Sequence, residues 1–286
     1  MLSNKVKEIM NLDITTVRPD DTIASVMAQM AEKNIGRVIV IDKQLPVGIF
    51  TENDVLKRIV NKRLNVFKTG IKKVMTSPVR GVPEDAHIID VLGKMYRGKF
   101  RHMLVRDPKR KMAGLVSMRR ILKLAVELGR DLNEIKTIGS IMSGRLVGVD
   151  EAQPIYDCVG TMAKQDITCV MVMCDEEPLG IFTERDVLRR VAVKDMDTKK
   201  EPVKTVMTPN PVIMDQSALI EEVLAEMYQR DFRNMPIRGT NGKLVGVVTM
   251  GDVLKYARAL DVDESVRKAW KEIEEYWDSD EQYTPG

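Results

Sequence analysis

Short apolar runs and amphipathic stretches alternate along the chain in an order that recurs four times. In the first amphipathic stretch, Ile23, Val26, Met27 and Met30 step by three and four, which is the spacing of one helix face. Acidic and hydroxyl residues precede this stretch, as is typical of a helix start. A short and mostly branched apolar run follows each amphipathic stretch and predicts a buried strand. These runs are Arg37–Ile41, Met103–Val105, Cys169–Met173 and Met235–Ile237.

A second strand and a second helix are predicted after a polar turn in each unit. The second strands are expected at Val47–Phe50, Ala113–Ser117, Leu179–Thr183 and Leu244–Thr249. The helices that follow them include Asp54–Val60 and Asp186–Val193. Because a short apolar stretch also opens each unit, the order is β-α-β-β-α over about 60 residues. We expect the four units at residues 5–64, 71–130, 135–196 and 203–260, followed by a tail at 261–286.

Two sequence markers define the period of the repeat. The first is a Gly-apolar-apolar-Ser/Thr-x-x-Asp element, which begins at Gly48, Gly114, Gly180 and Gly246, 66 residues apart. The second is an apolar-Met pair that opens each unit and ends at Met10, Met75, Met142 and Met207. A period of this length is the signature of a repeat architecture. Since a unit of this size can bury only a modest part of its surface, we expect two pairs, at residues 1–132 and 133–260.

Composition and charge narrow the class of protein. Of the 286 residues, 44% are hydrophobic and 30% are charged, which is typical of a globular protein rather than a disordered chain. The net charge of +3 is small for this length and gives little support for a polyanionic partner. There is no long apolar run, and residues 1–10 lack the apolar stretch of a signal peptide. We therefore expect a cytoplasmic protein that does not span a membrane.

Motifs for metal binding and catalysis are missing from the sequence. The three cysteines and two histidines lack the spacing of a metal site, so no metal is expected. The sequence also lacks a Gly-rich phosphate loop, His-Glu-x-x-His and Gly-x-Ser-x-Gly. We therefore predict that the protein is not an enzyme and has no catalytic residues.

The hydroxyl and the Asp of the repeated element allow two interpretations. A hydroxyl followed three residues later by an acid resembles a capping box, in which Thr51, Thr183 and Thr249 would cap helices without any ligand. Each pair also lies where a buried strand ends and a helix begins, which is where α/β folds usually bind ligands. The free N–H groups of a helix start suit a phosphate, and an Asp one turn later can accept both hydroxyls of a ribose.

The 66-residue unit with this element resembles the CBS domain, named from cystathionine β-synthase. Four copies in one chain are similar to the gamma subunit of AMP-activated protein kinase and to stand-alone archaeal and bacterial CBS proteins. The resemblance implies an α/β (α+β) fold of four β-α-β-β-α CBS repeats, paired into two Bateman modules, with a C-terminal amphipathic helix. It also implies that clefts between paired repeats bind AMP, ADP or ATP, with S-adenosylmethionine or a cyclic dinucleotide as further candidates. The implied ribose acceptors are Asp54, Asp186 and Asp252, with Thr51, Thr183 and Thr249 beside them.

The second unit departs from the pattern of the family. Arg120 replaces the Asp, and Ser117 replaces the Thr. Because Arg cannot accept a hydrogen bond, the ribose contact is missing there. We expect the second cleft to be empty, or Arg120 to serve a neighbouring phosphate. The structural alternative is an exposed helix residue beside Arg119.

The resemblance also implies which side chains bind phosphate. Arg101 and His102 match a basic segment that gamma subunits use for this purpose, and they would face the ligand of Asp54. By the same correspondence, Arg233 would serve the third unit's ligand and Thr168 the fourth unit's ligand. For Arg101 and Arg233, the alternative is an ordinary surface turn between helix and strand. If His102 lies beside phosphate, the affinity for nucleotide should fall above neutral pH. The phosphate candidates are Arg101, His102, Arg233, Thr168 and Arg120.

The tail after the repeats has a predicted helix of its own. Val266, Trp270, Ile273 and Trp277 step by four, three and four, and so share one helix face. This face either docks on the chain's own modules or anchors a second subunit or target protein, because Trp is favoured at binding centres.

These features together predict a regulatory sensor of adenine nucleotides that signals to a partner by a conformational change. The partner would be a second copy, giving a homo-oligomer such as a dimer, or a regulated protein; neither a membrane nor a nucleic acid is expected. Two alternatives stay open, namely a scaffold or assembly module with vestigial clefts and a nucleic-acid-binding protein modulated by nucleotide. Against the last, the basic runs lack interleaved aromatic residues that would stack on bases.

Overall fold

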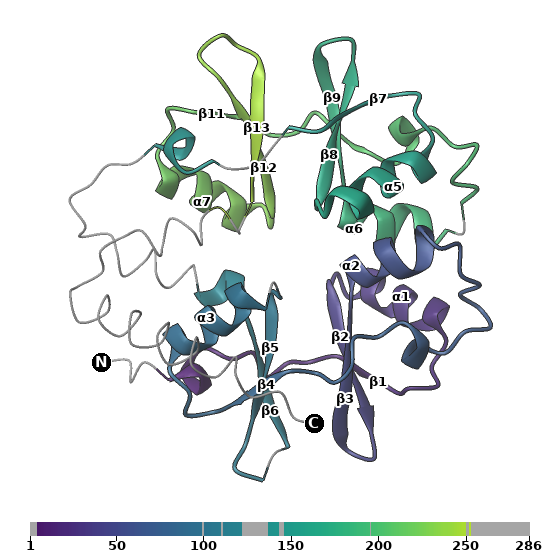
Figure 1. The fold of residues 1–286 in the computed structure, drawn as a ribbon, viewed down its shortest axis with the longest axis vertical. Helices are drawn as coiled ribbons and strands as arrows, with labels where there is room; N and C mark the ends of the chain where they lie inside the picture. The colour runs from purple at the N-terminus through teal and green to yellow at the C-terminus, as the bar shows by residue number, and fades with distance from the viewer. Residues whose placement is uncertain are drawn as a thin grey trace, which may run out of the picture.

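The computed structural model describes residues 5–98, 100–109, 111–121, 137–142, 146–194, 196–249 and 252. Within these ranges, four small sheets and their helices lie around a common centre (Figure 1). The first and third repeats lie on one side of the centre, and the second and fourth repeats lie on the other. Each repeat therefore borders two others and faces the remaining one diagonally across the centre.

The first repeat shows how the apolar pattern becomes a β-α-β-β-α unit. Strands β1 (Thr16–Val17) and β2 (Arg37–Asp42) pair in parallel, and β2 pairs with β3 (Leu45–Thr51) as an antiparallel hairpin. Helix α1 (Ile23–Glu32) connects β1 to β2, and the hydroxyl of its N-cap residue accepts a backbone N–H at 3.2 Å. The four apolar residues predicted to share one face of α1 are all buried, which confirms that prediction.

The same order recurs in the other three repeats. The second repeat contains β4 (Gly81–Pro83), α3 (Ile88–Arg97), β5 (His102–Arg106) and β6 (Met112–Ser117). The third contains β7 (Gly148–Asp150), α5 (Ile155–Gln165), β8 (Cys169–Cys174), β9 (Glu177–Thr183) and the short α6 (Glu184–Asp186), and β10 (Thr208–Pro209) follows it. The fourth contains β11 (Met214–Asp215), α7 (Ile220–Gln229), β12 (Asn234–Arg238) and β13 (Leu244–Thr249). The predicted α/β (α+β) fold of four repeats is confirmed.

The second helix of the first repeat is wound differently from its prediction. It begins as one α-helical turn, α2 (Glu52–Asp54), and continues as a π-helical turn, η2 (Val55–Val60). The Asn61 backbone N–H donates to the Leu56 carbonyl, five residues earlier, at 3.1 Å. The third repeat has the same winding in η6 (Val187–Ala192), which packs against η2. The predicted helices are thus correct in position and wrong in winding.

Paired repeats exchange their opening segments. The segment that opens the second repeat lies on the hairpin of the first, where Ile49 and Thr76 exchange backbone hydrogen bonds of 3.0 and 2.8 Å. The segment that opens the first repeat lies in turn on the second hairpin, where Asn11 and Leu115 exchange bonds of 2.7 and 3.0 Å. In the other half, β10 pairs with β9 in the same way. The first and second repeats are therefore interlocked in space, and the opening segment of the fourth repeat lies on the hairpin of the third.

The two sequence markers of the repeat are the two sides of this exchange. Gly48 lies so close to Met75 that a Cβ atom at the glycine would approach the Met75 Sδ atom to 2.3 Å. The spacing is similar, at 2.5 and 2.4 Å, for Gly114 with Met10 and Gly180 with Met207. The glycine is required because the methionine of the partner repeat occupies the space of its side chain.

The largest apolar cores join repeats of different pairs. One core combines α1 and η2 of the first repeat with α5 and η6 of the third, and Phe50 and Phe182 are both fully buried in it. A second core combines helices and strands of the second and fourth repeats. A smaller cluster lies between the two sheets within each sequence pair. Ile39 and Leu104 belong to the cluster between the first and second repeats, and Met171 and Val247 to the one between the third and fourth. Each repeat thus has one neighbour across its helices and another across its sheet.

One sequence prediction lies outside the described residues, and another can be examined only within them. The tail helix with Val266, Trp270, Ile273 and Trp277 lies outside the described residues. In the parts that are described, none of the helices has the length and apolarity needed to cross a lipid bilayer.

Candidate functional site

The Thr/Asp pair of the first repeat shows how the repeated element is built. Thr51 ends β3 in an extended conformation, and Asp54 lies one turn into the helix. The Asp54 Oδ2 atom accepts the Thr51 backbone N–H at 2.9 Å and the Thr51 hydroxyl at 2.8 Å. These bonds fix the carboxylate at the helix start, as in a capping box.

The third and fourth repeats have the same geometry. Asp186 Oδ2 accepts the Thr183 N–H at 2.9 Å and its hydroxyl at 2.7 Å, and the Asp186 N–H donates back to the Thr183 hydroxyl at 3.3 Å. Asp252 Oδ2 accepts the N–H and the hydroxyl of Thr249, each at 2.8 Å. The capping interpretation is therefore confirmed in the first and third repeats, whereas the residues that follow Asp252 lie outside the described residues. In the first and third repeats, Oδ2 is taken up by the cap, which leaves Oδ1 for a further partner.

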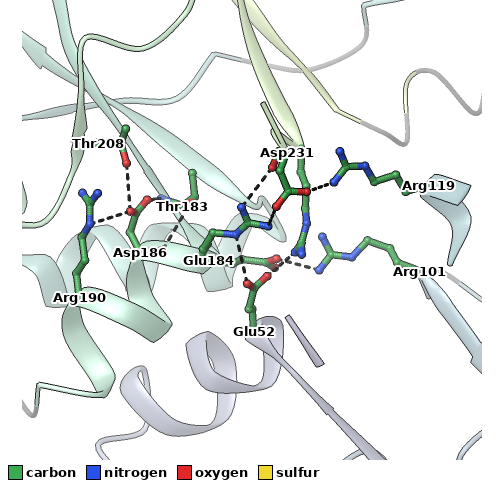
Figure 2. Close-up of polar contacts among 11 residues, drawn as sticks. Glu52, Arg101, Arg119, Thr183, Glu184, Asp186, Arg190, Thr208 and Asp231 are labelled. Atoms are coloured by element: carbon green, nitrogen blue, oxygen red, sulfur yellow. Dashed lines mark hydrogen bonds and ion pairs between the residues drawn. The ribbon is translucent and has the colours of Figure 1, made fainter. Parts of the chain in front are cut away.

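That remaining oxygen is held less tightly. Asp54 Oδ1 has the Thr76 hydroxyl at 3.4 Å and a guanidinium nitrogen of Arg58 at 3.3 Å. These contacts are longer than the bonds to Oδ2, so Oδ1 is the better placed acceptor for a further hydroxyl. The third repeat has the same arrangement, with Asp186, Thr208 and Arg190 at 3.3 and 3.4 Å (Figure 2).

The position of this oxygen depends on the paired repeat. Thr76 belongs to the segment that the second repeat lays on the hairpin of the first. Asp54 is therefore enclosed at the junction of two repeats and is only 5% exposed. Burial raises the pKa of Asp54, and the charge of Arg58 and the donors Thr51 and Thr76 oppose this shift.

The second repeat keeps the cap but loses the acceptor. The Ser117 hydroxyl accepts the Arg120 backbone N–H at 3.3 Å, as an N-cap residue does. The Arg120 side chain is exposed and offers only donors. The second repeat therefore lacks the carboxylate acceptor that the Asp provides in the other three repeats.

Diagonal ion pairs connect the repeats across the centre (Figure 2). Arg101 of the second repeat donates to Glu184 Oε2 of the third at 2.8 Å, and Arg233 of the fourth is paired with Glu52 Oε2 of the first. Both glutamates are buried, with 1% of Glu52 and 5% of Glu184 exposed. The sequence prediction missed them, although both follow the motif Thr directly, where the second and fourth repeats have Met.

A second set of ion pairs extends this cluster. Asp231 Oδ2 accepts from Arg185 at 2.8 Å, and Asp231 Oδ1 is paired with Arg119. The Arg119 guanidinium also lies 5.2 Å from the centre of the Tyr228 ring. Sequence reasoning missed Asp231 and Arg185 because their contacts join segments that are far apart in the chain.

Cations outnumber anions at the centre among the described residues. Arg37 has a buried Nε atom without a hydrogen-bond partner, and Arg189 has two such nitrogens. Burial and then the charge of Arg233 lower the pKa of Arg37 to about 10. Six arginines, at 37, 101, 119, 185, 189 and 233, stand against the carboxylates of Glu52, Glu184 and Asp231. Such an excess of positive charge favours an anionic ligand.

The predicted phosphate candidates are thus spread over the centre and its rim. Arg101 and Arg233 form ion pairs with Glu184 and Glu52 of the diagonal repeats. Their contact with phosphate stays a prediction. The Thr168 hydroxyl donates to Asn234 Oδ1 at 2.6 Å, at the junction of the third and fourth repeats. Burial, followed by the charges of three arginines, lowers the pKa of His102 well below its usual range. In this state His102 is neutral at neutral pH, so the predicted fall of affinity above neutral pH would move to the acid range.

Among the described residues, no group of three His, Cys, Asp or Glu side chains is arranged to hold a metal ion. The centre and the Thr/Asp pairs present carboxylate acceptors, hydroxyl groups and guanidinium donors.

Comparison with known proteins identifies the repeated unit. A family model for the CBS domain matches residues 6–61, 71–127, 138–193 and 203–259, which together make up more than half of the chain. Among solved structures, protein MJ1225 of Methanocaldococcus jannaschii, described as a proposed archaeal homologue of g-AMPK, has a TM-score of 0.75 at 18% identity. That match covers 88% of this chain and 99% of the other. At this identity, the likeness shows a shared fold.

Curated relatives have the same kind of repeat. The CBS domain-containing protein CBSCBSPB1 of Arabidopsis thaliana is 26% identical over 280 residues, which cover 85% of this chain and 52% of that protein. The chain thus spans about half the length of this relative. An uncharacterized 17.7 kDa protein of Acidianus ambivalens is 32% identical over 156 residues, which cover 52% of this chain and 93% of that protein.

Proposed function

The chain belongs to the CBS domain family, and we propose that it is a regulatory protein which binds adenine nucleotides in clefts between its paired repeats. The ligand is of the AMP, ADP or ATP type, and the ribose acceptors are Asp54, Asp186 and Asp252. Thr51, Thr183 and Thr249 position these carboxylates. The protein signals to a second copy or to a regulated partner and catalyses no reaction itself.

The observation that supports this proposal most strongly is that the two carboxylate oxygens of the aspartate make different contacts. In the first repeat, Oδ2 caps the helix, whereas Oδ1 has only contacts of 3.3 and 3.4 Å to Arg58 and Thr76. A ribose hydroxyl could replace these longer contacts without breaking the cap. The Asp of the other three repeats therefore has a use beyond helix capping, because Ser117 in the second repeat caps its helix without an Asp three residues later.

The charge of the centre supports a phosphate at the other end of the ligand. Arg101 and Arg233 are already paired with carboxylates, and a phosphate offers the same guanidinium groups charged oxygens that can accept paired N–H donors. If a phosphate replaced the glutamate as the partner of each arginine, the arginine would stay paired. The ion pair between the diagonal repeats would be broken. Ligand binding would therefore shift the packing of the four repeats relative to one another, and a partner could detect that shift.

Calorimetric titration tests the proposal directly. AMP, ADP, ATP, S-adenosylmethionine and cyclic di-AMP are titrated into the full chain and into Asp54→Ala, Asp186→Ala and Asp252→Ala. We expect up to three adenine nucleotides per chain, with each variant losing one site or weakening it at least tenfold, about 1.4 kcal/mol or more. Asp13→Ala, at an exposed position away from the motif, is the matched control and should bind as the unmodified chain does.

Other outcomes would point to another function. If none of the five compounds binds, the sensor proposal is wrong and a scaffold with vestigial clefts becomes the better account. If the protein is instead retained on DNA or RNA in a strongly salt-dependent manner, nucleic-acid binding is favoured.

A further inference from the structure

A groove of about 340 Å³ lies where the first and third repeats meet, between the segments that leave η2 and η6. Phe67 lies at its rim and is 62% exposed. Ligand clefts in proteins have volumes of about 300–1,000 Å³, so the groove has room for a large side chain. The apolar side chains that line it include Ile59, Val60, Leu64, Val191, Ala192 and Met196. We call this site the interhelical groove.

The exposure of Phe67 is fixed by the loop that holds it. Of the five phenylalanines, all of them among the described residues, Phe67 is the only exposed one. Asn65 Oδ1 accepts the backbone N–H groups of Phe67 and Lys68 at 3.1 and 3.2 Å, and the Val66 carbonyl accepts the Ala24 N–H at 3.1 Å. The loop is thus tied to α1 and holds the ring at the surface. An exposed ring beside an apolar groove is typical of a contact surface.

The loops around the interhelical groove carry an excess of positive charge. Residues 61–70 contain Lys62, Arg63 and Lys68 and no acid, and all three cations are exposed. Residues 193–201 contain three lysines and three acids and are neutral overall. Because charges across an interface tend to be complementary, the groove favours an occupant with an apolar face and an acidic flank.

The sequence of the tail, which lies outside the described residues, has both of these properties. Trp270 and Trp277 share one face of the predicted helix, and residues 272–281 contain six acids and no base. Residues 261–286 have a formal charge of −6 in a chain whose net charge is +3, so residues 1–260 carry +9. An acidic block of this kind is typical of an interaction segment.

The position of the fourth repeat indicates which copy supplies the tail. The tail follows the fourth repeat, whereas the groove belongs to the first and third, on the other side of the centre (Figure 1). The family match ends at residue 259, and six residues separate it from Val266. Six extended residues span about 20 Å, whereas a compact repeat of about 60 residues is about 25 Å wide. The tail of a second copy therefore reaches the groove more readily than the tail of the same chain.

We propose that the interhelical groove binds the tail helix of a second copy of this chain, with Trp277 seated in it beside Phe67. Trp is favoured at the centres of interfaces, and the acids around Trp277 then face the basic loop of residues 61–70. Reciprocal insertion of two tails gives a twofold dimer in which each copy fills the groove of the other. The dimer needs no nucleotide, so it does not depend on the proposed binding function.

Tryptophan fluorescence of the full chain reports on the tail, because Trp270 and Trp277 are its only tryptophans. We expect the emission of shielded rings in the unmodified chain and a shift toward the emission of the urea-unfolded chain in Phe67→Ala. Sedimentation equilibrium should show a dimer whose dissociation constant rises at least tenfold in this variant. Phe67 is exposed, so the variant should fold, and circular dichroism checks this. The control Leu12→Ala removes a side chain that is 71% exposed and outside the groove lining, and should change neither measurement.

A mixing experiment distinguishes the tail of a second copy from the tail of the same chain. The double variant of Trp270→Ala with Trp277→Ala keeps the groove and loses the anchors, whereas Phe67→Ala keeps the anchors and loses the rim. Each variant alone should dimerise poorly, and their mixture should form a dimer with one restored contact. Since only the Phe67→Ala chain then contains tryptophan, its emission should return toward that of the unmodified chain.

Three results would overturn the proposal. Solvent-exposed emission in the unmodified chain would mean that the groove does not hold the tail and that another partner covers it. Shielded emission that Phe67→Ala leaves unchanged would mean that the tail docks elsewhere. A monomer whose emission responds to Phe67→Ala but not to mixing would assign the groove to the tail of the same chain.

Discussion

The first and third repeats differ from the second and fourth in the charge that they bring to the centre. The odd-numbered repeats place a buried glutamate directly after the motif Thr, and the even-numbered repeats have Met there. The even-numbered repeats instead have an arginine directly before a strand, Arg101 before β5 and Arg233 before β12. Since each arginine pairs with the glutamate of the diagonal repeat, four copies of one fold act as two complementary kinds.

The largest expected effect comes from removing one of these glutamates. Glu52→Ala takes away the carboxylate that Arg233 and Arg185 share. We expect the free energy of unfolding to fall by about 3 kcal/mol, because breaking a buried ion pair leaves an uncompensated charge. Urea denaturation followed by circular dichroism measures this change.

Two further variants make this test specific. Glu176→Ala removes an exposed carboxylate paired with Lys243 and should leave the transition unchanged. Arg233→Ala combined with Glu52→Ala should cost less than the sum of the two single changes. Additive costs would mean that the two kinds of repeat are not coupled through this pair.

A smaller effect is expected where both kinds of repeat are alike. Gly48→Ala and Gly114→Ala each place a Cβ atom within 2.5 Å of a methionine sulfur of the paired repeat. We expect each to lose about 1–3 kcal/mol of stability through overpacking, with similar values in the two kinds of repeat. Gly160→Ala, which has no atom within 4 Å, should instead gain about 0.5–1 kcal/mol in its helix. Equal melting shifts for all three variants would contradict the exchange contact.

The smallest expected effect separates the two even-numbered repeats, because the second has His102 where the fourth has Asn234. Burial lowers the pKa of His102, so the folded state favours the neutral ring. The unfolded state then binds more protons, and stability is complete above the ordinary pKa of about 6.5 and falls as the pH decreases below it. His102→Gln should lose less stability between pH 7 and pH 5 than the unmodified chain, by about 1 kcal/mol.

The matched control for this pH effect is the other histidine. His87 is exposed and lies 3.0 Å from the Lys5 ammonium group. His87→Gln should keep the pH dependence of the unmodified chain. If His102→Gln keeps it as well, the imidazole of His102 does not contribute to acid sensitivity.

Much of the fold could be predicted because its signals are local. The stripe from Ile23 to Met30 and the glycine-methionine markers reflect contacts within one helix or one pair of repeats. The π-helical winding of η2 could not be predicted, since Val55, Leu56, Ile59 and Val60 are buried at spacings that an α-helix also allows. The turn packs against η6 of the third repeat, a contact between distant segments that the local pattern does not contain.

The candidate site could be predicted only in its local part. Thr51 and Asp54 are three residues apart, so their pairing follows from a short stretch of chain. Glu52 and Arg233 are 181 residues apart, and their contact depends on how the two pairs of repeats dock. The sequence does show that Glu follows the motif hydroxyl in the first and third repeats and Met in the second and fourth. This alternation predicts an ion pair only once it is known which repeats lie diagonally opposite.

The exchange of opening segments restricts how such a chain can change its length. The segment with Met75 completes the first repeat, and the segment with Met10 completes the second. Deletion of a single 66-residue copy from the gene would leave one hairpin uncovered and one segment without a hairpin. Deletion of the first and second copies together would remove a closed exchange, so that neither of its two segments would be left without a hairpin. Repeats of this kind should therefore be gained or lost as pairs. An even number of repeats follows because the methionine of one repeat packs on the glycine of its paired repeat.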